Sequence, residues 1–293
     1  MDLPRSSKIR KTLLSLLSVT VTNADSRVLA SDGSSFSTIM PAPIRLRPSK
    51  ARGYANHGWL KSFHTFSFAN YFDPEFEQFG PLRVINEDTV APGEGFGEHP
   101  HRDAEIFSYI LSGTLKHHDS MNNKELLNRG DIQFTSAGSG IRHSEFNGRK
   151  DAEVRFLQIW ALPRARGLTP NYQTKTFPDE KKIDNLLTLL TPDGANGTIQ
   201  INQDFRMHAS LLSSGSSVKL DLGIRRGYVH VPIMPDSTGL EISGKLIKTD
   251  GDSPTVVLMP GDGAFIEGVK ELHIKGRSNL DGKRTEVVIF DFV

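Results

Sequence analysis

Two short stretches of the chain carry side chains that can bind a metal ion. His99 and His101 lie two positions apart, and so do His143 and Glu145. Successive side chains of an extended strand point to opposite faces, so both members of such a pair point the same way. If the two strands lie side by side, three imidazoles and one carboxylate converge on one point. The sequence therefore predicts a mononuclear metal site that leaves positions open for water, substrate or O₂.

The composition restricts which metal this site can hold. The chain contains no cysteine, which excludes disulfides, iron–sulfur clusters and thiol nucleophiles, so His and carboxylate must hold any metal. Three nitrogens and one oxygen suit Fe(II), Mn, Co, Ni, Cu or Zn. Fe(II) is the first choice because iron is available in cells and thiolates are absent. The net charge of +1 gives no reason to expect direct nucleic-acid binding, and no apolar run is long enough to cross a membrane.

Short alternating segments joined by Gly- and Pro-containing turns predict an all-β protein of jelly-roll type with a few short helices, one of them over residues 179–190. The chain also repeats itself. Ser112-Gly113-Thr114-Leu115 recurs 131 residues later as Ser243-Gly244-Lys245-Leu246, and Arg129-Gly130-Asp131 recurs at the same offset as Pro260-Gly261-Asp262. Two tandem barrels explain this repeat.

The same offset predicts that only the first barrel binds metal. It shifts the four candidate ligands of the first barrel onto residues of which only one is a ligand type: His230, Pro232, Ile274 and Gly276. The predicted organisation is a flexible extension over residues 1–42, a metal-binding barrel over 43–165 and a barrel without a metal site over 166–293. Basic residues and a short apolar stretch in the extension allow organellar targeting. We favour an untargeted tail and a cytoplasmic or nuclear protein.

Three motifs in order resemble one family. Ser62-Phe63-His64-Thr65-Phe66-Ser67-Phe68 comes first, Gly97-Glu98-His99-Pro100-His101-Arg102 follows, and the third runs from Ser136 through Ala137-Gly138-Ser139-Gly140-Ile141-Arg142 to His143-Ser144-Glu145. Together they closely resemble the pirin family of the cupin superfamily. The resemblance runs from about Ile44 to the end of the chain and is densest up to about residue 178.

This resemblance implies a bicupin that binds metal, usually iron, in its amino-terminal barrel through His99, His101, His143 and Glu145. Some pirins are quercetin 2,3-dioxygenases, which open the flavonol ring with O₂ and release carbon monoxide. We therefore expect a flavonol-like aromatic substrate and O₂, with Glu145 as the base that takes the proton of the flavonol hydroxyl. The alternative is a metal- or redox-sensing co-regulator that binds a transcription factor, because other pirins act in that way.

Overall fold

The computed structural model describes residues 42–277 and 283–293, so the predicted extension over residues 1–42 lies, except for Ala42, outside the described residues. Strand is the dominant secondary structure, and the described helices are three short 3-10 turns, η1 (Ser49–Ala51), η2 (Asp179–Lys181) and η3 (Ala195–Gly197). The predicted all-β fold with a few short helices is thus confirmed. No helix of the described residues is long and apolar enough to span a membrane.

The strands of the first barrel form a seven-stranded sheet, in the order β12-β9-β6-β11-β4-β3-β2, and a four-stranded sheet, in the order β5-β10-β7-β8. Their bounds are β2 (Gly53–Asn56), β3 (Leu60–His64), β4 (Leu82–Val90), β5 (Gly95–His101), β6 (Glu105–Ser112), β7 (Thr114–Asp119), β8 (Lys124–Asn128), β9 (Asp131–Ser136), β10 (Ile141–Asn147), β11 (Val154–Ala161) and β12 (Asn171–Thr176).

The second barrel repeats this plan with the sheets β1-β20-β17-β22-β15-β13-β14 and β16-β21-β18-β19. Their bounds are β1 (Ile44–Arg47), β13 (Leu187–Thr191), β14 (Ile199–Gln200), β15 (Phe205–Ser213), β16 (Ser217–Asp221), β17 (Arg226–His230), β18 (Leu240–Leu246), β19 (Val256–Leu258), β20 (Gly263–Ile266), β21 (Val269–Gly276) and β22 (Arg284–Phe292).

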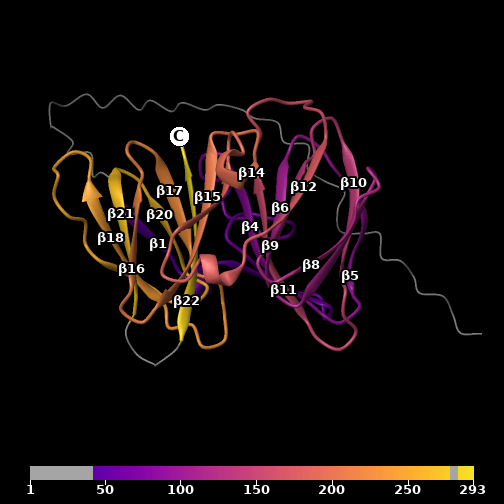
Figure 1. The fold of residues 1–293 in the computed structure, drawn as a ribbon, viewed down its shortest axis with the longest axis horizontal. Coiled ribbons are helices and arrows are strands. Elements are labelled where there is room, and N and C mark those ends of the chain that lie inside the picture. The colour runs from indigo at the N-terminus through magenta and orange to yellow at the C-terminus, as the bar shows by residue number, and fades with distance from the viewer. Residues whose placement is uncertain (1–41, 278–282) are drawn as a thin grey trace, which may run out of the picture. The chain divides into compact units, whose positions relative to one another are not determined.

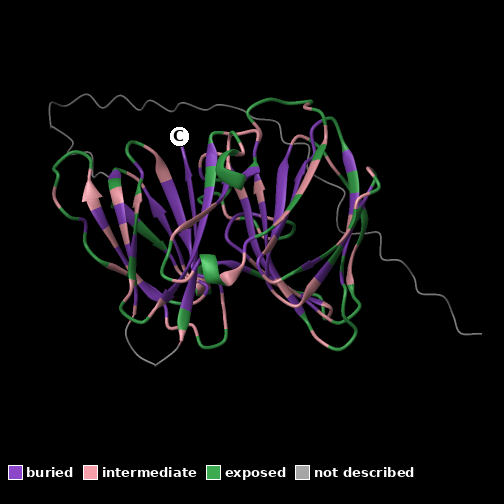
Figure 2. Ribbon diagram, in the orientation of Figure 1, coloured by how far each residue is buried: buried purple, intermediate pink, exposed green. Residues whose placement is uncertain are grey.

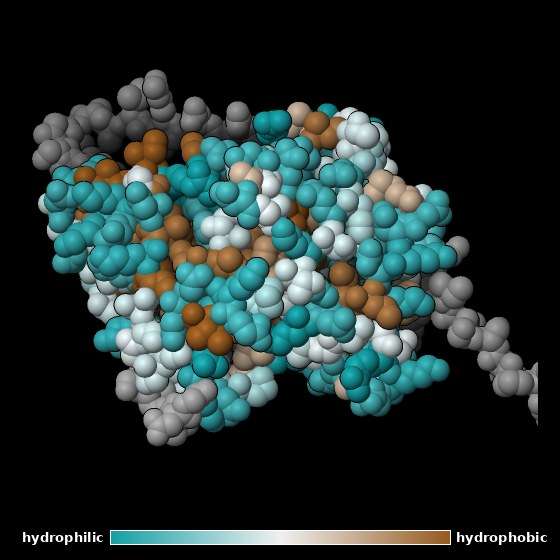
Figure 3. Space-filling model, viewed as in Figure 1, coloured by the Kyte–Doolittle hydropathy of each residue, from teal (hydrophilic) through white to brown (hydrophobic). Residues whose placement is uncertain are grey.

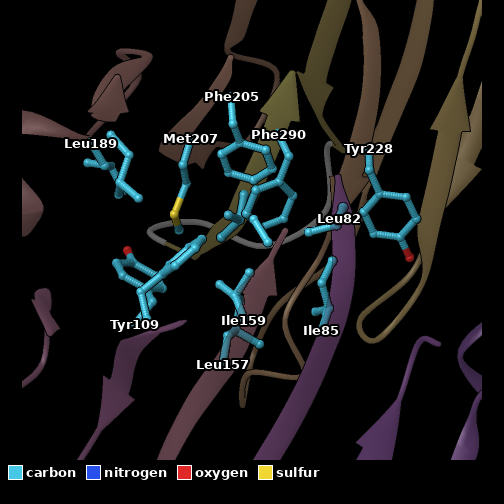
Figure 4. Packing of buried hydrophobic residues seen from close by; sticks show 14 of the residues in the cluster. Leu82, Ile85, Tyr109, Leu157, Ile159, Leu189, Phe205, Met207, Tyr228 and Phe290 are labelled. Atoms are coloured by element: carbon cyan, nitrogen blue, oxygen red, sulfur yellow. The ribbon is translucent and has the colours of Figure 1, made fainter. Parts of the chain in front are cut away.

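The two seven-stranded sheets pack against each other through a shared apolar core. In Figures 1 and 4, β4 and β11 of the first barrel face β15 and β22 of the second, and Leu157 and Ile159 point toward Phe205 and Phe290. Figure 2 shows the buried residues gathered along these central strands. The view in Figure 3 shows a face on which hydrophilic residues predominate, with smaller apolar groups between them. The barrels therefore share the largest apolar core that the described residues form.

The interiors of the two barrels differ. One continuous apolar cluster fills the second barrel, with Val218, Leu272 and Ile274 among its members. In the first barrel the apolar residues form two smaller clusters, and buried polar side chains such as Ser108 and Gln158 lie on the same inward-facing side of their strands. Because a buried polar group costs free energy unless it is paired, a polar interior marks this barrel as the one built around a site.

Two strands pair with a barrel other than the one to which the predicted ranges assign them. The first strand, β1, pairs with β20 of the second barrel, where Ile44 lies opposite Ile266, and β12 pairs with β9 of the first barrel. The predicted boundary at residue 165 stays a prediction.

The short helix predicted over residues 179–190 is wrong: only the 3-10 turn η2 forms there, and the leucines that follow extend into β13, which pairs with β15. Tertiary pairing overrides the helix-like spacing of those leucines.

The internal repeat is partly reflected in the backbone. Gly130 and Gly261 adopt matching left-handed conformations, with φ of 82° and 87°, at the turns that lead into β9 and β20. Gly113, by contrast, forms the turn between β6 and β7 at φ 77°, whereas Gly244 lies inside β18. A single offset of 131 residues therefore does not align the two barrels throughout, and His230 lies on β17 rather than on β16, the second barrel's counterpart of β5.

Candidate metal centre

The two strands that carry the candidate ligands are neighbours in the four-stranded sheet of the first barrel. β5 and β10 run antiparallel, with His99 directly opposite His143. A β-bulge between His143 and Glu145 shifts the register with β5, so that Glu145 lies opposite Phe96. Across the other edge of β10, in a regular register, Glu145 pairs with His117 of β7. The structure thus places all four predicted residues on adjoining strands.

The side chains form two overlapping groups. The ring nitrogens of His99, His101 and His143 lie within 4.8 Å of one another, and so do the ligand atoms of His117, His143 and Glu145. His143 belongs to both groups. Among the described residues, these are the groups of three or more potential metal ligands that come together, and both lie in the first barrel.

The polar atoms of the first group fit a cation. The Nδ1 of His99 lies 2.8 Å from the carbonyl oxygen of Gly97, which fixes the ring proton on Nδ1 and leaves the Nε2 lone pair free. That Nε2 faces the Nε2 of His143 at 3.1 Å. The Nε2 of His101 is buried and has no hydrogen-bond partner among the described residues. Nitrogen lone pairs that converge in this way suit a divalent ion shared between them.

The electrostatics favour the neutral forms of His101 and His143. Burial, together with the neighbouring His143 and His99, lowers the pKa of His101 to about 2, although Glu145 acts in the opposite direction. Burial and the nearby His99 and His117 likewise hold the pKa of His143 well below its usual value. A neutral imidazole is the form that donates a lone pair to a metal.

Two polar side chains on the floor of the barrel hold the carboxylate of Glu145. The hydroxyl of Ser108 on β6 donates to Oε1 over 2.9 Å, and the amide of Gln158 on β11 donates to Oε2 over 3.2 Å. Both donors come from the opposite sheet, so they fix the orientation of the carboxylate across the barrel. Such outer contacts tune a ligand's position and basicity.

His117 is a site residue that the predicted set of four ligands did not include. Of the adjacent pair His117 and His118, the strand alternation allows only one to face inward, and the structure buries His117 while His118 is exposed. The Nε2 of His117 lies 3.1 Å from Oδ2 of Asp119. Burial raises the pKa of Asp119, but hydrogen bonds from Asn123, His117 and Met121 outweigh it and lower that pKa, so Asp119 is a carboxylate.

Aromatic rings surround the imidazoles. Trp160 meets His101 edge-on at 4.9 Å between ring centroids, Phe68 packs against Trp160 at 5.6 Å, and Tyr172 stacks on His117 at 4.9 Å. Phe68 belongs to the first of the three sequence motifs, whereas no motif pointed to Trp160 or Tyr172. They give the site an apolar rim next to its polar ligands.

Comparison with known proteins shows which family has this architecture. The family described as Pirin matches residues 45–161, and the one described as Quercetinase C-terminal cupin domain matches residues 188–292. The quercetin 2,3-dioxygenase of Escherichia coli K12 is 45% identical over 189 residues, which cover 64% of this chain and 80% of that protein. The chain belongs to the pirin family.

Other pirins extend the match over most of the chain. A putative quercetin 2,3-dioxygenase of Pasteurella multocida, PM1685, is 36% identical over 255 residues, covering 85% of this chain and 100% of that protein. The crystal structure of the bacterial pirin YhhW from Escherichia coli in complex with nickel(II) is 36% identical and covers 85% of this chain and 98% of that one, with a TM-score of 0.72. The bicupin architecture expected from the resemblance is confirmed.

Proposed function

We propose that this pirin is a metal-dependent dioxygenase that opens the central ring of a flavonol with O₂ and releases carbon monoxide. One observation carries the proposal: the ring nitrogens of His99, His101 and His143 come together inside the first barrel, and His143 also belongs to the group that contains the hydrogen-bonded carboxylate of Glu145. The relative named quercetin 2,3-dioxygenase, 45% identical, supports the reaction class. The ligands we propose are His99, His101, His143 and Glu145.

A divalent ion bound there would act as a Lewis acid and orient the substrate hydroxyl and O₂. Fe(II) is our first candidate, and Mn, Ni, Co, Cu and Zn suit the same donors. The related pirin YhhW has been crystallised in complex with nickel(II), which keeps Ni among the candidates.

The chain's own side chains supply the proton acceptor and the walls. Glu145 is the carboxylate beside the imidazoles, and we propose that it accepts the proton of the flavonol 3-hydroxyl. The bonds from Ser108 and Gln158 hold its two oxygens in place while it does so. Trp160 and Tyr172 lie against the imidazoles and suit the flat faces of an aromatic substrate.

The test is to load the protein with Fe(II) and incubate it with quercetin in air and under nitrogen, recording flavonol absorbance and O₂ uptake. We expect one O₂ consumed per flavonol lost in air, and no loss under nitrogen or in the metal-free protein. Turnover under nitrogen would contradict a dioxygenase and indicate a non-oxidative cupin. Stoichiometric metal without flavonol consumption is the result expected of a metal-sensing co-regulator and would contradict the proposed reaction.

A further inference from the structure

The second barrel has a polar pocket that the metal chemistry does not use. The pocket is open to solvent and lies beside β13 and β15. Its volume of about 590 Å³ is within the range of small-molecule sites. Its lining combines hydroxyl groups, an amide, an imidazole and a guanidinium with a few apolar side chains. The polar members of that lining are Thr188, Thr191, Asp193, Asn196, Thr198, Arg206 and His208.

Three of the pocket's neighbouring groups form a hydrogen-bonded chain. Thr188 lies directly across from His208 in the pairing of β13 with β15, and its Oγ1 is 3.0 Å from the Nδ1 of His208. The Nε2 of His208 lies 2.7 Å from Oδ2 of Asp291 on β22. The other oxygen of Asp291 accepts from Arg225. A hydroxyl, an imidazole and a buried carboxylate thus stand in sequence.

The direction of each hydrogen bond follows from the carboxylate. Burial raises the pKa of Asp291, but the bond from His208 and the charge of Arg225 outweigh it and lower that pKa, so Asp291 accepts from the Nε2–H of His208. The Nδ1 of a neutral His208 then carries a lone pair, which leaves the Thr188 hydroxyl to donate to it. This is the arrangement in which a base activates a nucleophilic hydroxyl and a third group orients the base.

The chain of groups lies at the end of the second barrel that corresponds to the metal-binding end of the first. Asp291 is the penultimate residue of β22, and Trp160, which contacts His101, is the penultimate residue of β11. The two strands hold equivalent central places in their seven-stranded sheets. Asp291 therefore lies at the end of its barrel that corresponds to the end at which Trp160 contacts His101.

We propose that this pocket is a second active site, independent of the metal centre, in which Thr188 is the nucleophile for hydrolysis of small polar esters. The Thr188 oxygen attacks the ester carbonyl as His208 takes its proton. The alkoxide then leaves with that proton as the carbon–oxygen bond breaks, and water hydrolyses the acyl-threonine by the same route. Arg206 lines the same pocket, with its guanidinium 4.0 Å from Asp291, and is the cation available there to stabilise the negative charge on the carbonyl oxygen.

A fluorophosphonate probe tests the nucleophile directly. Its phosphorus forms a bond to the attacking oxygen, fluoride leaves and the proton goes to the base. We expect mass spectrometry of the labelled full-length protein to place the phosphonyl group on Thr188. We also expect hydrolysis of p-nitrophenyl acetate to fall at least about 100-fold in Thr188→Val and in His208→Gln.

Two further variants keep the test decisive. His273→Gln is the matched control, because His273 also pairs with a carboxylate, Glu271 at 2.5 Å, on the surface of the same barrel. It should label and hydrolyse like the wild type. Thr188→Ser, which preserves the hydroxyl if the Val variant does not fold, should retain both labelling and hydrolysis. Absence of label on Thr188, or label that persists equally in His208→Gln, would overturn the proposal.

Discussion

At the scale of single residues, two buried carboxyls of the first barrel, Glu145 and Asp88, differ in their hydrogen-bond partners. Glu145 has a hydrogen-bond donor on each oxygen, from Ser108 and Gln158. Asp88, on the inner face of β4, is fully buried, and its nearest partner is the hydroxyl of Ser62. Burial raises the pKa of Asp88 to about 7, with the charges of Glu145 and Glu87 adding to the effect and the Ser62 bond opposing it. Two donors thus orient the carboxyl of Glu145, whereas burial favours the protonated form of Asp88.

Glu145→Gln separates the two roles proposed for Glu145. The amide keeps the shape of the side chain but loses the charge and the capacity to take a proton. We expect flavonol turnover to fall at least about 100-fold and metal affinity to weaken. Equilibrium dialysis and the aerobic quercetin assay measure the two effects. Glu98→Gln, an exposed carboxyl in the same motif that pairs with Arg142 at 2.8 Å, is the control. Full turnover by Glu145→Gln would exclude Glu145 as the base.

Asp88→Asn should change how stability depends on pH. The folded-state pKa of Asp88, about 7, lies above the ordinary aspartate pKa of 3.8, so the native state binds more protons than the unfolded state between these values. Its contribution to stability is therefore fully present below pH 3.8 and lost as pH rises through 7. We expect the variant to gain stability relative to the wild type between pH 4.5 and pH 8. Urea unfolding of both metal-free proteins at these pH values measures this gain, and a constant difference would refute it.

At the scale of elements, strand alternation allowed the site to be predicted in outline. His99 and His101, like His143 and Glu145, share a strand face because of their spacing, and the structure sets those strands side by side. The sequence did not reveal Ser108 or Gln158, because each comes from a strand of the opposite sheet and contacts Glu145 only through tertiary packing. It also did not show that β1 crosses into the second barrel, since strand pairing between residues 44 and 266 leaves no local pattern.

Ile44→Ala tests the contribution of that crossing strand. Ile44 is 6% exposed and packs into the core of the second barrel, whereas Leu46, two positions along the same strand, is 38% exposed. Removing the buried side chain should cost about 2–4 kcal/mol of unfolding free energy. Leu46→Ala should cost less than about 1 kcal/mol. Chemical denaturation measures both values, and equal losses would show that β1 does not contribute to the core as described.

At the scale of residues 42–293 as a whole, polar contacts reinforce the apolar core between the barrels. Glu286 on β22 of the second barrel accepts hydrogen bonds from two residues of the first: Tyr109 at 2.5 Å and Arg129 at 3.0 Å. Lys182, whose side chain is completely buried, donates to the Tyr109 hydroxyl at 2.9 Å and lies 4.0 Å from Glu286. Asp179 pairs with the same two cations, Arg129 at 2.7 Å and Lys182 at 2.9 Å, so two carboxylates neutralise them at this interface.

Glu286→Ala should therefore destabilise the packed barrels. Lys182 and Arg129 keep Asp179 as their counter-charge, but the buried Tyr109 hydroxyl loses its acceptor and Arg129 loses one partner, a loss of about 1–3 kcal/mol. The control is Glu271→Ala, which removes a surface carboxylate paired with Lys219 at 3.2 Å and should cost less than about 1 kcal/mol. Unfolding free energies from urea titration compare the two. Similar small losses in both variants would mean that the interface does not depend on Glu286.

The most direct measurement of the central claim is anomalous X-ray diffraction from crystals of the iron-loaded protein at the iron edge. We predict one anomalous peak per chain, inside the first barrel and about 2.0–2.2 Å from nitrogens of His99, His101 and His143 and an oxygen of Glu145. A peak in the second barrel, or one that any of these side chains fails to reach, would contradict the account.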